Sequence, residues 1–433
     1  MPTTIPEQIG GRLANLVACL YFWPFPSSYS HVDAGQLGWF RKESKEAISS
    51  TKTTDVPETS VSETSKAAAT ISYLSQLDGV RFIAVALVLY DHWMAERNTL
   101  PLGPLGVTIF FVLSGFLITR ILLSSKDKLA SRPDGLSVYL KTFYIRRTIR
   151  IFPLYYFSLL LLAVLNVPPV RETLAWCVLY ATNIYIAYYQ QWMGVIDHFW
   201  SLAVEEQVYL IFPLLLFIVP RRHVPLTMIL MIIGSVLFRY YLYAQDYSWV
   251  VAYVFTPACL DSFGLGALLA YLWLYQKEWI DKLFTNSLGV VAALAVYVVL
   301  VVLSKTYDAP HNVVSEVWDR LAGSVLGFFL IGRAAIGFKG WMRWFLENPV
   351  SRYLGQISYG LYIFHNLVYN FYHTPPGHPT IRIWHKLTNL APMLSGSFIF
   401  EFFYYALLTV LMASLSWFLL EKPINALKDR FSY

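Results

Sequence analysis

Long apolar segments separated by short polar loops recur along most of the chain. Ten of them are long enough to cross the roughly 30 Å hydrocarbon core of a bilayer as helices. These ten segments cover residues 74–95, 104–123, 143–166, 200–219, 225–243, 251–275, 286–304, 321–337, 354–372 and 397–420. An eleventh segment, 173–189, is shorter and more polar. The pattern predicts an all-α, polytopic membrane helix bundle of about ten transmembrane helices, with 173–189 as a re-entrant or peripheral helix.

The first 70 residues have a different character. The stretch TKTTDVPETSVSETSK is polar and rich in Ser and Thr, which is typical of a disordered linker. The apolar patch at 13–23 is too short to cross a bilayer, and we expect it to lie at a membrane interface. The sequence therefore predicts a cytosolic, largely disordered segment over 1–70, a transmembrane domain over 71–425 and a cytosolic tail over 426–433.

Composition and charge support the membrane class. Hydrophobic residues make up 56% of the chain and charged residues only 14%, which excludes an ordinary soluble protein. The net charge of +6 does not indicate nucleic-acid binding, because the basic residues gather between apolar segments as topology signals. The densest group lies between the second and third segments, so that loop and both termini should face the cytosol, with the protein in the cell (inner) membrane. The three cysteines are scattered, and we expect neither disulfides nor a metal.

The first apolar segment, which contains RFIAVALVLYDH, carries Arg81 near one end and His92 near the other. Eleven helical steps rotate by roughly 20° more than three full turns, so the two side chains share one helix face about 16 Å apart. In the predicted orientation Arg81 faces the cytosol and His92 the outer leaflet. Either both residues mark the membrane interfaces, or the helix links a cation on one side to a titratable imidazole on the other.

The second and third segments contain small and basic residues that suit a ligand. Ser114 and Gly115 lie in mid-segment, where small residues let another helix or an acyl chain approach the backbone. Arg147 and Arg150 have i, i+3 spacing on one helix face. Retention of positive charge on the inside explains these arginines, and so does phosphate binding, which suits the guanidinium fork.

A polar stripe runs along the first part of the fourth predicted span and begins just before it. It consists of His198, Ser201, Glu205 and Tyr209. Steps of three, four and four residues align these side chains, whereas Glu206 lies about 100° away. A carboxylate this deep in an apolar segment needs a partner or a water-filled cavity. A structural hydrogen bond between helices is the alternative explanation.

Five motifs, taken in order, resemble those of acyltransferase family three, the integral-membrane O-acyltransferases. They are LDGVRFIAV followed by His92, FFVLSGFLI, RRTIRIFP, WSLAVEEQVYL and ISYGLYIFH. The resemblance covers residues 74 to about 424. Members of that family transfer acyl groups, often acetyl from acetyl-CoA, to hydroxyls of cell-surface glycans or secreted small molecules. The resemblance therefore implies acyl-CoA as the donor co-substrate and a hydroxyl of a glycan or small molecule as the acceptor.

The resemblance also implies roles for single residues: His92, Arg81 and Glu205 in catalysis, and Arg147 and Arg150 in binding acyl-CoA. We expect Ser114 and Gly115 to contribute to the same donor site. The imidazole of His92 would act as general base, with Glu205 orienting the ring or stabilising the imidazolium, although an acyl-histidine intermediate fits the same residues. The residues expected to line a cavity are Asp261, His198, Ser201, Tyr209 and His365.

One motif departs from the family's pattern. Members commonly carry an arginine two positions before the aspartate of TPACLDSF, where this chain has Cys259 before Asp261. The sequence therefore predicts that a cation or its salt bridge is missing at this place.

Two other function classes remain open. A proton-coupled transporter would use the intramembrane His, Glu and Arg residues as a relay, although no inverted repeat is visible. A non-catalytic scaffold in the lipid bilayer is the second. Binding and consumption of acetyl-CoA distinguish the acyltransferase from both.

Overall fold

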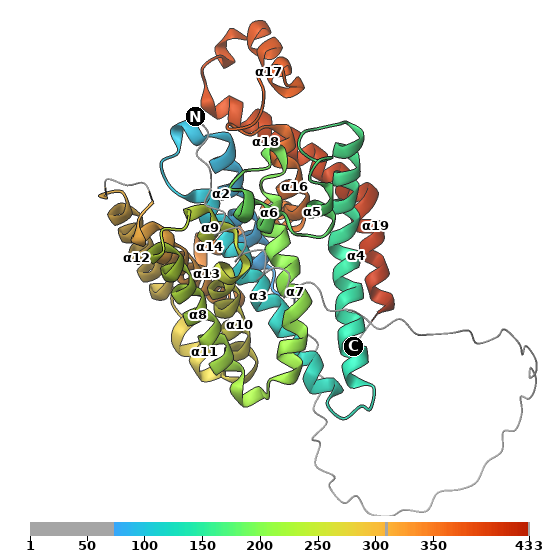
Figure 1. The fold of residues 1–433 in the computed structure, drawn as a ribbon, viewed down its shortest axis with the longest axis vertical. Coiled ribbons are helices and arrows are strands. Elements are labelled where there is room, and N and C mark those ends of the chain that lie inside the picture. The colour runs from blue at the N-terminus through green and yellow to red at the C-terminus, as the bar shows by residue number, and fades with distance from the viewer. Residues whose placement is uncertain (1–72, 308–310, 432–433) are drawn as a thin grey trace, which may run out of the picture. The chain divides into compact units, whose positions relative to one another are not determined.

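The computed structural model describes residues 73–307 and 311–431, and every regular element in these ranges is a helix (Figure 1). The α-helices are α2 (Gln76–Trp93), α3 (Leu102–Leu129), α4 (Gly135–Val164), α5 (Leu174–Val178), α6 (Thr182–Tyr189), α7 (Phe199–Ile218), α8 (Val224–Ala244), α9 (Trp249–Val254), α10 (Leu260–Tyr275), α11 (Lys277–Phe284), α12 (Leu288–Ser304), α13 (Asp319–Ile336), α14 (Gly340–Glu347), α15 (Pro349–Gln356), α16 (Ser358–Val368), α17 (Pro379–Leu390), α18 (Phe398–Ser416) and α19 (Lys422–Asn425). Short 3-10 or π segments connect or extend several of them. The predicted disordered segment over 1–70, with its apolar patch at 13–23, lies outside the described residues.

Six helical segments in the described part of the chain are long and apolar enough to cross a membrane. They are α3, α4, α7, α8 with its preceding turn (Arg221–Ala244), α10 with its preceding turn (Thr256–Tyr275), and α18 with its continuation (Phe398–Arg430). Two bent pairs raise the number to eight if each pair is one span: α11 with α12 at 64°, and Val314–Ile336 with α14 at 89°. The predicted class, an all-α polytopic bundle, is confirmed, but fewer helices meet these criteria than the ten predicted.

The difference comes mainly from two predicted spans. Segment 74–95 forms α2, whose 18 residues include three charged side chains. Segment 354–372 is divided between α15 and α16, and α16 has only 11 residues. The shorter segment 173–189 forms α5 and α6, of five and eight residues. Neither is long enough to cross a bilayer, in agreement with the re-entrant or peripheral placement that was predicted.

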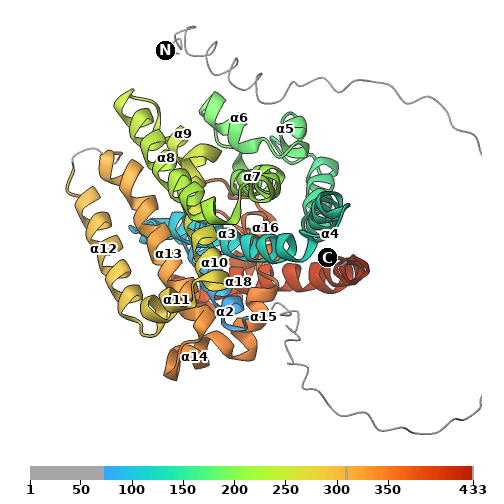
Figure 2. The same cartoon turned by 90° about the horizontal axis from the view of Figure 1, so that it is seen from below.

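Helix α3 forms the centre of the bundle. It packs most extensively against α10 and α2, and also contacts α13, α7 and α4. Figure 2 shows α3 and α10 enclosed by these neighbours. Of the most apolar 18-residue window of α3, 78% is buried inside the protein. The corresponding windows of α8 and α18 are 22% and 17% buried. The remaining apolar surface of the outer helices is therefore available to face lipid.

Two glycines permit the close approach of α3 and α10. A Cβ on Gly266 would lie 2.0 Å from the carbonyl oxygen of Val112, and a Cβ on Gly115 would lie 2.5 Å from that of Phe263. Small residues at such crossings let helix backbones come into contact. Gly115 therefore serves helix packing. Although it was expected to contribute to the donor site, it does not line either cavity described below.

Helices α15 and α16 fix one side of α2. Asn348 caps α15 by accepting a hydrogen bond from the Ser351 amide, and Pro349 occupies the first helical position, where its missing N–H costs nothing. At the C-terminal end of α2, Trp93 Nε1 donates to the carbonyl of His365 on α16 at 3.3 Å. The C-terminal end of α2 is thus held against α16.

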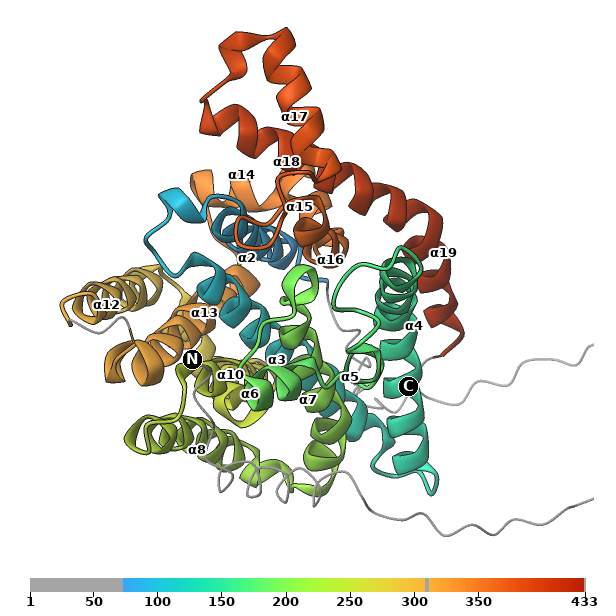
Figure 3. The ribbon, with the colours of Figure 1, turned by 45° about the horizontal axis from the view of Figure 1, so that its top comes forward.

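Figure 3 shows α17 standing away from the rest of the bundle.

Candidate active site

Two cavities lie near opposite ends of α2. The larger has a volume of about 550 Å³ and the smaller about 270 Å³. The larger, which we call the histidine cavity, is lined among others by Asp91, His92, Asp197, His198, His311 and His373. The smaller, which we call the arginine cavity, is lined among others by Arg81, Ser114, Arg147, Arg150, Ser201, Glu205 and Tyr209. Arg81 and His92, which share one face of α2, therefore line separate cavities.

Three arginines meet in the arginine cavity. Arg81 comes from α2 and pairs with Asp78 one turn earlier, whereas Arg147 and Arg150 come from α4. The Arg147 guanidinium lies over the ring of Tyr209, 5.2 Å from its centroid, a cation–π contact. The i, i+3 spacing thus brings both α4 arginines to one cavity, as predicted. Three guanidinium groups around one space suit a phosphate-bearing ligand.

Glu205 belongs to the arginine cavity. Ser114 Oγ donates to Glu205 Oε1 at 2.9 Å, and the Tyr209 hydroxyl donates to Oε2 at 3.0 Å. The predicted alignment of Glu205 with Tyr209 is therefore confirmed, and Glu206 lines the same cavity. The prediction that Glu205 orients His92 is wrong, because both carboxylate oxygens bond to other groups and Glu205 does not line the histidine cavity.

His92 instead contacts α16. His92 Nδ1 lies 2.7 Å from His365 Nε2 and 3.1 Å from Asn366 Oδ1. His365 Nδ1 lies 2.6 Å from the Tyr362 carbonyl, which can only accept, so this nitrogen carries the proton. His365 Nε2 then accepts from His92 Nδ1–H, and the lone pair of His92 is on Nε2. His365 does not line either cavity, contrary to the prediction, and it holds the ring that does.

A second chain of hydrogen bonds assigns the same tautomer to His92. His198 Nε2 donates to the Ile363 carbonyl at 3.2 Å, which leaves His198 Nδ1 to accept from Asn366 Nδ2 at 2.9 Å. This contact turns Asn366 Oδ1 toward His92 Nδ1. The sequence analysis missed Asn366, although an amide directly after His365 in an apolar helix was an available signal.

A loop covers the end of α2 beside these histidines. The Phe371 amide donates to the His92 carbonyl at 3.0 Å, and His373 Nε2 in the same loop contacts Asp197 Oδ2. Burial raises the pKa of the Asp197 carboxyl above its ordinary value, and the hydrogen bond from His373 opposes this rise. The loop thereby brings His373 to the histidine cavity next to a buried carboxylate.

Tyr362 separates the two cavities. Tyr362 and Val107 line both of them. The Tyr362 hydroxyl lies 2.6 Å from Ser201 Oγ and donates to the His198 carbonyl at 3.1 Å. A group passing from the arginine cavity to His92 therefore meets this side chain.

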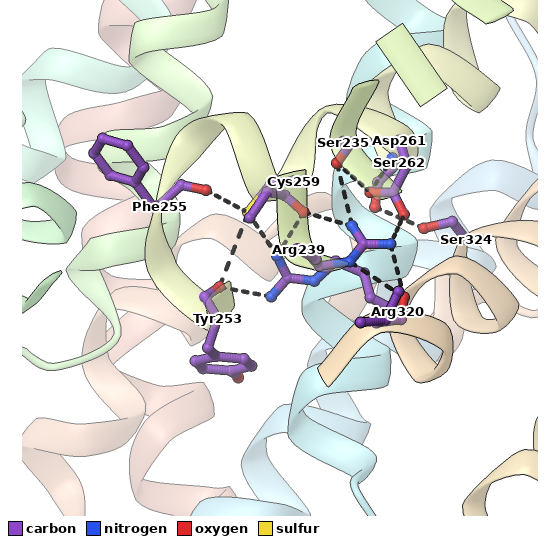
Figure 4. Close-up of polar contacts among 11 residues, drawn as sticks. Ser235, Arg239, Tyr253, Phe255, Cys259, Asp261, Ser262, Arg320 and Ser324 are labelled. Carbon is purple, nitrogen blue, oxygen red and sulfur yellow. Dashed lines mark hydrogen bonds and ion pairs between the residues drawn. The ribbon is translucent and has the colours of Figure 1, made fainter. Parts of the chain in front are cut away.

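Asp261 lies in a buried network apart from both cavities (Figure 4). It is 0% exposed, and its Oδ2 accepts from Arg239 Nη2 at 2.9 Å. Ser235 joins the pair, because its hydroxyl accepts from Arg239 Nη1 at 3.1 Å. The prediction that Asp261 lines a cavity is wrong, since the buried ion pair satisfies its charge instead.

The cation predicted to be missing next to Asp261 is supplied by other helices. Arg239 comes from α8, and Arg320 from α13 places its Nη1 2.8 Å from Cys259 Sγ (Figure 4). Arg320 Nη2 also donates to the Tyr253 carbonyl at 2.6 Å. The prediction of a missing salt bridge is therefore wrong, because charges distant in sequence occupy the position.

Comparison with known proteins identifies the family. A family model described as an acyltransferase domain matches residues 74–421. The chain belongs to acyltransferase family three. A protein of Staphylococcus aureus strain MRSA252 with a provisional name as an O-acetyltransferase is 30% identical over 389 residues, covering 83% of this chain and 59% of that protein. O-acetyltransferase OatA of S. aureus strain COL is 26% identical over 376 residues, covering 82% and 57%. No solved structure matches the chain at a significant level.

For this member of acyltransferase family three, the matched range includes the residues of both cavities from Arg81 to His373. The chain spans less than three fifths of the length of these relatives. The predicted resemblance to the family is confirmed. Within the ranges that the structure describes, no group of three or more His, Cys, Asp or Glu side chains could hold a metal ion.

Proposed function

We propose that this protein is a membrane O-acyltransferase that moves an acyl group, acetyl in the first instance, from acyl-CoA to a hydroxyl of a cell-surface glycan or an exported small molecule. The observation that carries the proposal is the pair of cavities at opposite ends of α2. One is lined by three arginines, and the other contains an imidazole whose Nε2 is left free to accept a proton. The names of the relatives, as O-acetyltransferases, support acetyl as the group transferred.

The arginine cavity is the proposed donor site. Arg81, Arg147 and Arg150 would hold the phosphates of acyl-CoA by charge-assisted hydrogen bonds. The apolar part of the wall comes from α3, where Phe110, Leu113 and Leu117 line the cavity, so it can accommodate the uncharged arm of the donor. Glu205 and Ser114 would lie beside that arm rather than at the reacting hydroxyl.

The histidine cavity is the proposed acceptor site, with His92 as general base. Nε2 of His92 takes the proton of the acceptor hydroxyl while the hydroxyl oxygen attacks the thioester carbonyl. The carbon–sulfur bond then breaks, the CoA thiolate leaves and the imidazolium returns the proton to it. His365 and Asn366 would stabilise the imidazolium by accepting a hydrogen bond from Nδ1–H. In an alternative mechanism the same nitrogen first takes the acyl group, as an acyl-histidine intermediate, and then passes it to the acceptor hydroxyl.

Transfer between these sites requires passage beside Tyr362. Its side chain and Val107 line both cavities, so the acyl end of the donor would reach His92 by displacing the Tyr362 ring or passing along it. The arginine cavity would open to the cytosol and the histidine cavity to the outside. In this scheme the protein is a multi-pass protein of the cell membrane with both termini in the cytosol.

The test uses the full chain in detergent or vesicles with radiolabelled acetyl-CoA. Mass spectrometry of surface glycans and exported small molecules, with and without the protein, should show an increment of one acyl group on a hydroxyl. Acetyl-CoA that is neither bound nor consumed, together with identical spectra, would contradict the proposal. If protons cross the vesicle membrane with a solute under the same conditions, the relay residues serve transport instead.

A further inference from the structure

Asp and Glu outnumber Lys and Arg among the described residues that line the histidine cavity. Its acidic residues are Asp91, Asp197, Glu316 and Asp319. Arg320 is the only Lys or Arg among the described residues that line it. The Arg320 guanidinium is already engaged, because it donates to the Tyr253 carbonyl and contacts Cys259 Sγ. Little positive charge therefore remains to receive an anionic ligand.

Two of these carboxylates have an oxygen without a partner. Asp197 is only 8% exposed, and its Oδ1 has no hydrogen-bond partner among the described residues. The Oδ1 of Asp319 is also buried and without a partner in that part of the chain. Leaving a carboxylate oxygen buried and unpaired is costly, so both carboxylates have unused capacity to accept a hydrogen bond.

Aromatic rings form another part of the cavity wall. Trp249 stacks on His311 with 4.3 Å between ring centroids, and Trp192 lies 6.3 Å from Trp249. All three line the cavity, as does Tyr253. Aromatic faces attract cations and also pack against the apolar faces of ring-shaped ligands.

Three of the four histidines that line the cavity are already engaged by neighbouring groups. His373 is paired with Asp197, and His92 and His198 are joined through Asn366 in a network that needs both rings neutral. A carboxylate or phosphate of a ligand in this space would face the cavity's own carboxylates at short range, and like charges at short range repel.

We infer that the histidine cavity selects an acceptor that carries a protonated amine near its hydroxyl, of the amino-sugar class, and discriminates against acceptors that carry a carboxylate or phosphate. The amine would donate to the carboxylates of Asp197 and Asp319, while the sugar ring packs against Trp192 and Trp249. The inference rests on the proposed function only in treating this cavity as the acceptor site.

Three matched methyl glycosides test this selectivity on the purified full chain: methyl glucosaminide, methyl glucoside and methyl glucuronide. Binding is measured by the change in intrinsic tryptophan fluorescence, and transfer by label from radiolabelled acetyl-CoA. We expect the glucosaminide to bind at least about tenfold more tightly than the glucuronide, with the glucoside between them. Asp197→Asn with Asp319→Asn should remove most of that difference. Glu172→Gln, at an exposed carboxylate outside the cavity, should preserve it.

Each outcome has a definite meaning. Equal or tighter binding of the glucuronide, no binding of any glycoside at millimolar concentration, or an unchanged ratio in the double variant would overturn the inference. The expected order of binding without transfer of label would support the inference and count against the acyltransferase proposal. Transfer of label with no dependence on glycoside charge would support the acyltransferase proposal and contradict the inference.

Discussion

At the residue scale, the protonation of His92 is decided by groups on another helix. Its Nδ1 contacts His365 and Asn366, which are 273 and 274 positions away in the chain. His365 Nδ1–H donates to the Tyr362 carbonyl, and the Asn366 amide nitrogen donates to His198 Nδ1. Both partners therefore accept from His92 Nδ1–H. The Nδ1 of His92 is therefore held by an imidazole and an amide and not by a carboxylate, which separates it from the familiar pairing of histidine with an acid.

Replacing His92 tests the proposed base directly. His92→Ala should lower acyl transfer by about two to four orders of magnitude, the usual contribution of general acid–base catalysis, while acyl-CoA binding stays unchanged because the donor site lies in the other cavity. Steady-state transfer and equilibrium CoA binding check this. His223→Ala, at an exposed histidine on another loop, is the control. A His92→Ala protein with near wild-type transfer would remove His92 from the mechanism.

The Asn366 chain makes a second residue-scale prediction. Asn366→Ala and His198→Ala should each reduce kcat by about tenfold, because the first removes a hydrogen-bond acceptor of His92 Nδ1 and the second removes the contact that orients that acceptor. The double variant should lose no more than the more damaged single variant, with KM for acyl-CoA unchanged throughout. Independent, multiplicative losses would show that the two residues do not act through one chain.

At the element scale, helices meet wherever small residues or paired charges allow it. Helix α4 brings its arginines to α2 and α7 around the arginine cavity, and α10 lies against α3 through glycines. The ion pair between Arg239 and Asp261 joins α8 to α10 with both side chains almost fully buried. The spacing of residues along α4 predicted that Arg147 and Arg150 share one helix face. It gave no sign of the ion pair between Arg239 and Asp261.

The two arginines of α4 should bind the donor. Arg147→Gln together with Arg150→Gln is expected to weaken acyl-CoA binding by about a hundredfold or more, since each charge-assisted hydrogen bond to phosphate contributes about 1.5–3 kcal/mol. Isothermal titration with a non-hydrolysable acyl-CoA analogue measures it. Arg132→Gln provides the control, because Arg132 is exposed and pairs with Asp134 outside both cavities. Unchanged affinity in the double variant would leave these arginines as topology signals.

The crossing of α3 and α10 should tolerate no side chain at Gly266. Gly266→Ala would place a methyl group 2.0 Å from the Val112 carbonyl oxygen, so the helices must separate, at a cost of about 1–3 kcal/mol. Thermal unfolding in detergent should show a lower midpoint. Gly234→Ala in α8, where nothing lies within 4 Å, should be neutral or slightly stabilising because alanine favours the helix. Equal midpoints for the two variants would contradict the packing argument.

At the scale of the whole molecule, the proposed function depends on the orientation of the bundle. The basic loop between α3 and α4 and the C-terminal end should share one side of the membrane, and the α2–α3 loop should be on the other. Arg146 on α4 supports the first grouping, because it donates to carbonyls of Lys428 and Phe431 near the end of the chain. The two cavities would then open to opposite sides.

Cysteine labelling tests this orientation in sealed cells. Ala130→Cys and a cysteine in the C-terminal tail should react only after the membrane is permeabilised, whereas Asn98→Cys should react with an impermeant reagent from outside. Cys19 is replaced by serine in every variant, while Cys177 and Cys259 are buried. Labelling of position 130 from outside would reverse the scheme and exchange the proposed donor and acceptor sides.

The structural class of this protein and much of its candidate site follow from the order of its residues alone. Apolar length predicts helices in a bilayer, and steps of three and four residues place side chains on one helix face, so spacing alone pairs Arg147 with Arg150 and Glu205 with Tyr209. Which helix faces meet one another depends on the packing of the bundle. That packing places Glu205 away from His92, puts His365 and Asn366 beside it, and supplies Arg239 to Asp261. These contacts join helices distant in the chain, and periodicity fixes the direction of a side chain on its own helix but not the neighbour that it meets.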